Sequence, residues 1–300
     1  MKLFKKIKSK ISHFPYFYQW IILVNMNNDI STSFSKFKEI MPTKDRFWAD
    51  PFVIYKDQKH HIFFEEFLNS QNKGHLSVMT VDNNGNYTKP VKILECDYHL
   101  SYPSMFEFQN EWYLIHGTIH NSKSYVELFK CNNFPFQWKH DRKLIIDIPL
   151  VDTTMFFYNK KWWIFACKAE NNGTSRSEEL MLFYSDNPLS ANWIPHPLNP
   201  IVSDIRNARP AGKIFEMNNK IIRPAQNCFQ VYGNGLSFNE IIKLNENEYE
   251  EKHLEFFKPD WKNSLIGLHT FNYEKGCTVI DARIKRNRLN LLKLESNFII

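Results

Sequence analysis

Glycine is scarce in this chain, with 9 among 300 residues, and this scarcity excludes several common ligand-binding folds. Dinucleotide-binding and Walker-type domains hold phosphates in glycine-rich loops between a strand and a helix. The sequence contains no such loop. We therefore predict neither a nucleotide-binding α/β domain nor a bound cofactor.

Cysteine is also sparse, and its spacing suggests no pairing. The five cysteines are odd in number and far apart, and no Cys-x-x-Cys motif occurs. This pattern favours reduced thiols in the core over a disulfide framework or a zinc site. His60-His61 and His116-x-x-x-His120 lack the context of a metalloprotease helix, so we expect no metal.

Long apolar runs are absent as well. The run from Trp20 to Val24 is too short to span a bilayer, and no secretory signal follows the lysines near the start, so we expect a cytoplasmic protein. Residues 1–19 form a basic segment, and Leu3, Phe4, Ile7, Ile11 and Phe14 recur in it at helical spacing. A basic amphipathic helix predicts peripheral contact with an anionic membrane on its inner face, with a solvated basic tail as the alternative.

Aromatic residues, by contrast, are abundant, and they belong to a repeat. The chain has 26 Phe and 16% aromatic residues in all, and residues 20–300 read as one domain. Each repeat has a polar head, an apolar strand, a two- to four-residue polar turn and a second apolar strand. The five heads, 50 to 60 residues apart, are Asp50-Pro51, Tyr102-Pro103, Asp152-Thr153, Arg209-Pro210 and His269-Thr270.

Repeats of this length hold about four short strands each, so the sequence predicts an all-β fold, a five-bladed β-propeller. In a propeller the first strand of every blade lines the central channel. The five heads should therefore converge on one mouth of that channel. The rest of the basic residues are scattered among acids, which argues against a nucleic-acid partner.

Five motifs carry a family resemblance: Trp48-Ala49-Asp50-Pro51-Phe52, Leu100-Ser101-Tyr102-Pro103, Ala208-Arg209-Pro210-Ala211-Gly212, Arg223-Pro224-Ala225-Gln226 and Gly267-Leu268-His269-Thr270-Phe271. Together they resemble the propeller found at the N-terminus of plant glucosamine inositolphosphorylceramide transferases and in bacterial proteins of surface-polysaccharide loci. More distantly, the chain is similar to the five-bladed furanosidases of glycoside hydrolase families 43, 32 and 68. The resemblance implies that Asp50 matches their base or nucleophile. Their second-blade Asp is replaced here by Tyr102, and Asp152 is nearest to their third-blade acid.

Glycosyl transfer needs an ionised carboxylate and a group that stabilises the leaving group. Asp50, Asp152 and Glu66 are the candidate catalytic carboxylates. Arg209 and Arg223 suit a phosphate leaving group, because a guanidinium binds phosphate oxygens in a fork; structural ion pairs with Asp50 or Asp152 are the alternative. The other candidate substrate-binding residues are Trp48, Tyr102, Gln226, Tyr232 and His269.

Three functions remain compatible with these residues. The first is a glycosyltransferase of bacterial surface polysaccharide or glycolipid synthesis, with a sugar donor and a glycan or glycolipid acceptor. The second is a furanosidase-like hydrolase, and the third is a glycan-binding propeller without catalysis. The basic N-terminus and the arginines at the heads favour the first.

Overall fold

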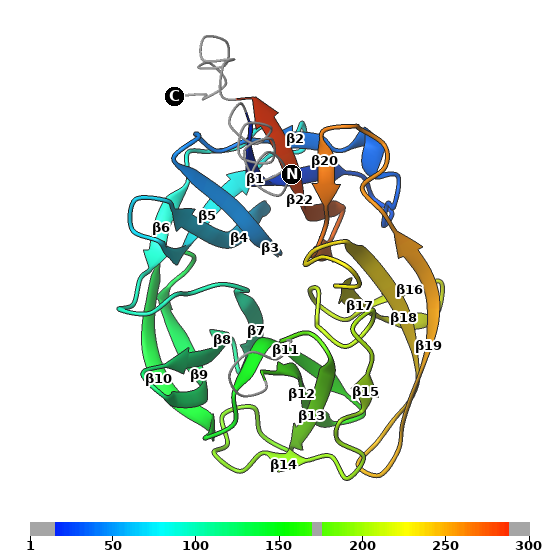
Figure 1. Cartoon of the computed structure of the whole chain (residues 1–300). Coiled ribbons are helices and arrows are strands. Elements are labelled where there is room, and N and C mark those ends of the chain that lie inside the picture. The colour runs from blue at the N-terminus through cyan, green and yellow to red at the C-terminus, as the bar shows by residue number, and fades with distance from the viewer. Residues whose placement is uncertain (1–15, 170–175, 288–300) are drawn as a thin grey trace, which may run out of the picture.

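The computed structural model describes residues 16–169 and 176–287, and these ranges are almost entirely β-structure. Five antiparallel sheets surround a central axis, which confirms the predicted five-bladed β-propeller (Figure 1). The expected basic helix of residues 1–14 lies outside the described ranges. Within them the only helical element is the 3-10 turn η1 (Phe34–Lys36), and no helix there could cross a membrane.

The first two blades are regular four-stranded sheets that follow the chain from the axis outward. Blade 1 consists of β3 (Arg46–Lys56), β4 (Lys59–Leu68), β5 (Lys73–Val81) and β6 (Val91–Leu94). Blade 2 consists of β7 (Ser104–Phe108), β8 (Glu111–His120), β9 (Lys123–Asn133) and β10 (Gln137–Ile146).

Blades 3 and 4 repeat this order. Blade 3 consists of β11 (Leu150–Tyr158), β12 (Lys161–Lys168), β13 (Glu179–Ser185) and β14 (Ile194–Pro195), with the short β15 (Val202–Ser203) also paired to β13. Blade 4 consists of β16 (Phe215–Met217), β17 (Lys220–Asn227), β18 (Gly235–Leu244) and β19 (Tyr249–Phe257).

Blade 5 joins the two ends of the described chain and closes the ring. Its inner strands β21 (Phe271–Glu274) and β22 (Cys277–Asn287) come from the end of the chain, and β20 (Leu265–Gly267) also pairs with β22. Its outer strands β1 (Tyr16–Met26) and β2 (Lys38–Ile40) come from the beginning. β1 and β22 pair along their whole length, so the prediction that the strand around Trp20–Val24 completes the last blade is confirmed.

The polar turns of the repeat explain why the inner hairpins form where they do. Both residues of each two-residue turn have positive φ, as in a type I′ hairpin, which favours Asn, Asp and Gly. These turns are Asp57-Gln58, Gln109-Asn110, Asn159-Lys160, Asn218-Asn219 and Lys275-Gly276. The apolar strands they connect pack blade against blade.

The core consists of clusters in and between neighbouring blades. Between blades 1 and 2, for example, Phe52, Tyr102 and Phe129 are buried together. All five cysteines are free; four are buried and Cys96 is half-buried, as expected for reduced core thiols.

Candidate functional site at the channel mouth

Three of the blade heads share an uncommon backbone conformation. Asp50, Tyr102 and Asp152 have φ values of 51°, 48° and 52°. This left-handed region is tolerated by Asp and is unfavourable for a bulky Tyr. The ladders β3–β4 and β11–β12 are also interrupted at Asp50 and Asp152, as in a β-bulge. Bulges redirect side chains and are over-represented next to active sites.

The Asp50 carboxylate is buried and held by two donors. The Thr270 hydroxyl donates to its Oδ1 at 2.9 Å, and the Tyr102 backbone N–H donates to its Oδ2 at 3.2 Å. Burial raises the pKa of Asp50 to about 6; His269 opposes the rise, whereas Asp152 and Asp281 add to it. Asp50 is thus a carboxylate whose protonation changes close to neutral pH.

His269 lies beside Asp50 and is oriented by a second carboxylate. Its Nδ1 is 2.5 Å from Asp281 Oδ2, and its Nε2 is 3.8 Å from Asp50 Oδ1. The Trp20 ring stacks on the imidazole, with 3.9 Å between ring centroids. Burial disfavours the charge on His269, but Asp281 and Asp50 outweigh it, so the pKa of His269 lies above its ordinary value.

Asp50, His269 and Asp281 have the donor types of a metal site, because one ligand atom from each lies within 4.8 Å of the others. The oxygens of Asp281 are already occupied. Oδ1 accepts from the N–H groups of His269 and Thr270, and Oδ2 accepts from the N–H of Asp50. A carboxylate with these partners is better suited to orient His269 than to bind a cation.

Across the mouth, Arg209 and Asp152 form a largely buried ion pair. Arg209 Nε donates to Asp152 Oδ2 at 2.6 Å, and Gln226 Nε2 donates to the same oxygen at 2.8 Å. The Arg209 guanidinium also lies 5.1 Å from the ring centroid of Tyr232, which in turn meets the His269 ring edge to face at 5.4 Å. The ion-pair alternative for Arg209 therefore holds, with Asp152 as its partner.

Glu65, which the sequence reasoning did not select, faces this acidic group. It is 5% exposed, and its Oε1 lies 3.4 Å from His99 Nε2. Burial and the charges of Asp50, Asp152 and Asp281 raise the pKa of Glu65 well above its usual range.

Seven of the ten predicted site residues form one connected group: Asp50, Tyr102, Asp152, Arg209, Gln226, Tyr232 and His269. The structure places the other three elsewhere. Glu66 accepts hydrogen bonds from Trp48 and Arg46 on the opposite face of β4, and Trp48 packs in the core beside Phe64. Trp48 therefore has no free ring face for a sugar.

Arg223 is the third of these residues. It is 1% exposed and forms a two-pronged ion pair with Glu251, with its Nε and Nη2 at 2.8 and 2.7 Å from the two carboxylate oxygens. This pair ties β17 to β19 inside blade 4. Of the two arginines expected to bind phosphate, Arg209 therefore lies at the mouth and Arg223 does not.

Side chains also bridge the ring across its axis. The Tyr102 hydroxyl of blade 2 accepts the N–H of Gly212 in blade 4 at 2.6 Å. Lys213 of blade 4 donates from Nζ to the Val53 carbonyl of blade 1 at 2.8 Å. These blades are not neighbours, so the bonds cross the centre.

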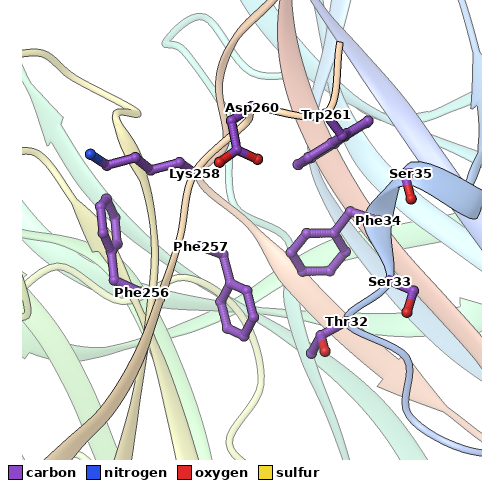
Figure 2. A pocket seen from close by; sticks show the side chains of 9 residues that line it. All are labelled: Thr32, Ser33, Phe34, Ser35, Phe256, Phe257, Lys258, Asp260 and Trp261. Carbon is purple, nitrogen blue, oxygen red and sulfur yellow. The ribbon is translucent and has the colours of Figure 1, made fainter.

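A separate hollow of about 300 Å³ lies on the outside, between η1 and the end of β19 (Figure 2). Phe34 lies between Trp261 and Phe257, and the Asp260 carboxylate points toward the same space. It shares no lining residue with the Asp50 group. At the mouth, by contrast, four buried acids and a buried histidine lie together, namely Asp50, Glu65, Asp152, Asp281 and His269, so the mouth is the candidate site.

The fold and this site define a class: a five-bladed propeller with buried acids at the heads of its inner strands. Residues 24–274 match the family model described as glucosamine inositolphosphorylceramide transferase 1, N-terminal, and the chain belongs to this family. This is the family that the sequence motifs indicated.

The plant members of the family are much longer proteins. Glucosamine inositolphosphorylceramide transferase 1 of Oryza sativa subsp. japonica is 32% identical over 208 residues, covering 68% of this chain and 27% of the rice protein. The Arabidopsis thaliana protein of the same name is 29% identical over 234 residues, covering 76% of this chain and 30% of the plant protein. The chain thus spans less than a third of these curated relatives.

Among solved structures, the chain is similar in fold to Zg3597, a family 117 glycoside hydrolase of Zobellia galactanivorans. The TM-score is 0.57 and the sequence identity 11%, and the match covers 95% of each chain. This likeness concerns the architecture of the propeller.

Proposed function

We propose that this protein is a carbohydrate-active enzyme that transfers a glycosyl group at the channel mouth, with Asp50 as its catalytic carboxylate. The observation that carries the proposal is the setting of Asp50, a buried carboxylate with a pKa of about 6 and His269 Nε2 at 3.8 Å. A base is most effective when its pKa is close to the working pH. The plant relatives are named glucosamine inositolphosphorylceramide transferases, a name that contains a sugar and a lipid, and this supports glycosyl transfer here.

In the proposed reaction Asp50 accepts the proton of an acceptor hydroxyl. The hydroxyl oxygen then bonds to the anomeric carbon of an activated sugar phosphate, and the bond from that carbon to the phosphate oxygen breaks. Arg209 stabilises the charge that develops on the phosphate, since a guanidinium keeps its proton and can offer N–H groups besides the Nε that binds Asp152. His269, oriented by Asp281, lies 3.8 Å from Asp50 and supplies positive charge there when it is protonated.

The acceptor that fits this proposal is a glycan or glycolipid in the synthesis of a bacterial surface polysaccharide or glycolipid, at the inner face of the membrane. Two features support a lipid-linked acceptor: the names of the plant relatives and the basic residues 1–15. A hydrolase would use the same carboxylate with water as the acceptor.

The test is turnover by the full-length protein with nucleotide sugars, sugar 1-phosphates and aryl furanosides, with and without lipid and glycan acceptors. Asp50→Asn should keep the fold, because Asn also tolerates the left-handed backbone, and should lower kcat by roughly 10³-fold, as expected for a lost general base. Asp97→Asn, at an exposed aspartate, is the matched control.

The products separate the three functions. Transfer to an acceptor supports the proposal, and release of free sugar by water indicates a hydrolase. If the wild type turns over none of these donors and Asp50→Asn merely weakens glycan binding, the mouth is a binding site and the proposal fails.

A further inference from the structure

The mouth-side ends of β1 and β22 present an exposed row of aromatic and basic side chains. Tyr16 and Tyr18 are 36% and 44% exposed, and Ile266 on the adjacent β20 is 37% exposed. The Lys285 ammonium lies 4.2 Å from the centroid of the Tyr16 ring, and the Arg283 guanidinium lies 5.1 Å from that of Tyr18. We call these five residues the β1–β22 patch.

The composition of the patch is that of a surface that contacts lipid head groups. Tyrosine rings are enriched at membrane interfaces, where one end of the side chain is apolar and the other wet. Basic side chains beside them are attracted to anionic lipids. Neither Arg283 nor Lys285 has a carboxylate partner within the described ranges, so both charges are free to meet an external anion.

The sequences that adjoin the patch extend the same chemistry. Tyr16 pairs with Asn287, so β1 begins and β22 ends at the same end of blade 5, and in sequence residues 1–15 precede β1 and residues 288–300 follow β22. The first segment contains Lys2, Lys5, Lys6, Lys8 and Lys10, and the second contains Arg288 and Lys293 among Leu289, Leu291, Leu292 and Leu294. The full chain has a net charge of +6. The sequences that adjoin both strands of the patch are therefore rich in basic and apolar residues.

The patch is also continuous with the candidate site. Side chains alternate along a strand, so Tyr16, Tyr18 and Trp20 lie on one face of β1. Trp20 stacks on His269, four residues and roughly 13 Å along the strand from Tyr16. Tyr232, whose ring centroid is 6.4 Å from that of Trp20, belongs to a loop that also exposes Phe229 and Val231.

We infer that the β1–β22 patch docks this protein on an anionic lipid bilayer, with the channel mouth turned toward the head groups. The inference rests on the exposed rings, on two basic side chains that have no carboxylate partner within the described ranges, and on the continuity of the patch with the mouth. It does not depend on chemistry at Asp50. It would place a lipid-linked sugar within reach of the His269 side of the mouth.

The experiment uses the full chain and sedimentation with vesicles of phosphatidylcholine, with and without phosphatidylglycerol. The wild type should bind the anionic vesicles preferentially. Arg283→Glu with Lys285→Glu should weaken that binding by about 30-fold or more, since each basic residue near an anionic surface contributes about a fivefold factor. Lys139→Glu with Lys252→Glu, at exposed lysines of the outer strands β10 and β19, changes net charge equally and should have a much smaller effect.

A second variant tests the apolar part without changing charge. Tyr18→Ser with Ile266→Ser should weaken binding several-fold, while circular dichroism and the melting temperature show that the propeller is intact. Equal losses in the two double charge reversals would mean that net charge or the terminal segments bind the vesicles, and would overturn the inference. A dimer in sedimentation velocity that only Arg283→Glu with Lys285→Glu abolishes would assign the patch to a second copy and would also overturn it.

Discussion

Glu65 and Glu66 are consecutive on β4 and equally buried, at 5% and 6% exposure, yet their surroundings differ in kind. Glu66 accepts from four donors: Arg46 at 2.8 Å, Trp48 at 3.2 Å, His75 at 3.2 Å and Ser77 at 2.7 Å. Glu65 has His99 at 3.4 Å as its near partner and faces the carboxylates of the mouth.

The two pKa values move in opposite directions as a result. Burial alone would raise the pKa of Glu66, but its donors outweigh burial and lower it to about 2. Burial raises the pKa of Glu65, and the neighbouring carboxylates raise it further. The donors around a carboxylate, rather than its depth, therefore separate a structural acid from one that a ligand could use. A buried carboxylate that lies among other carboxylates with few donors, as Glu65 does, destabilises the fold, and such arrangements are typical of functional sites.

The largest change in stability is expected for Glu66→Ala. It leaves the buried groups that now donate to Glu66 without an acceptor, which should lower the free energy of unfolding by about 3 kcal/mol at pH 7. Urea denaturation measures this. Because the folded pKa is depressed, the contribution of Glu66 is present above pH 4.5 and is lost as pH falls toward 2, so the difference from wild type should shrink there.

Glu111→Ala, at an exposed glutamate, is the control and should change stability by less than about 0.5 kcal/mol. A Glu66→Ala protein as stable as this control would show that the four donors form hydrogen bonds to water in place of Glu66. The contrast with Glu65 would then lose its physical basis.

Glu65→Gln should have a smaller effect of opposite sign. The raised pKa means that folded Glu65 keeps a proton which the unfolded chain releases above about pH 4.5, so wild-type stability falls as pH rises through the folded pKa. Glutamine cannot ionise, so the variant lacks this loss of stability at high pH. We expect the variant to exceed wild type by about 1 kcal/mol at pH 8 and to match it near pH 4.

Urea denaturation at pH 4 and pH 8 measures the difference in the free energy of unfolding between the variant and the wild type. His269 is present in both proteins, so its own titration contributes equally to both and drops out of this difference. A Glu65→Gln protein that is less stable than wild type at pH 8 would show that the charged form of Glu65 is stabilised at the mouth. Glu65 would then belong with Glu66 as a structural acid.

The sequence predicted the propeller because its repeat is local and marked at every blade by polar heads and type I′ turns. It did not predict which glutamate faces the mouth. Glu65 and Glu66 are consecutive, so their side chains point to opposite faces of the strand, and a shift of one residue in register would exchange them. The interruption of the β3–β4 ladder at Asp50 cannot be recognised in the amino-acid sequence. Asp281 was missed as a partner of His269, although an aspartate inside the apolar run Val279-Ile280-Asp281-Ala282 was a signal of a buried polar contact.

Arg223 and Trp48 were expected at the site because the sequence does not show which way their side chains point. Their motifs resemble the family, but side-chain direction decides function, and it depends on partners far along the chain. Arg223 pairs with Glu251, 28 residues away, and Trp48 with Glu66, 18 residues away. By contrast, the heads Asp50, Asp152 and His269 converge because the closure of the ring fixes them, and blade spacing alone was enough to predict that.

The smallest expected effect is the coupling between the two glutamates. Their side chains lie on opposite faces of β4, and the partners of Glu65 and Glu66 given above do not overlap. Separated groups without shared partners usually act additively, and these two side chains point away from each other. The Glu65→Gln with Glu66→Ala double variant should therefore differ from the sum of the single variants by less than about 0.5 kcal/mol at pH 7. Urea denaturation of the four proteins gives this coupling energy. A coupling above about 1 kcal/mol would mean that the backbone of β4 shifts when either side chain changes, so that the mouth and the blade interior respond as one unit.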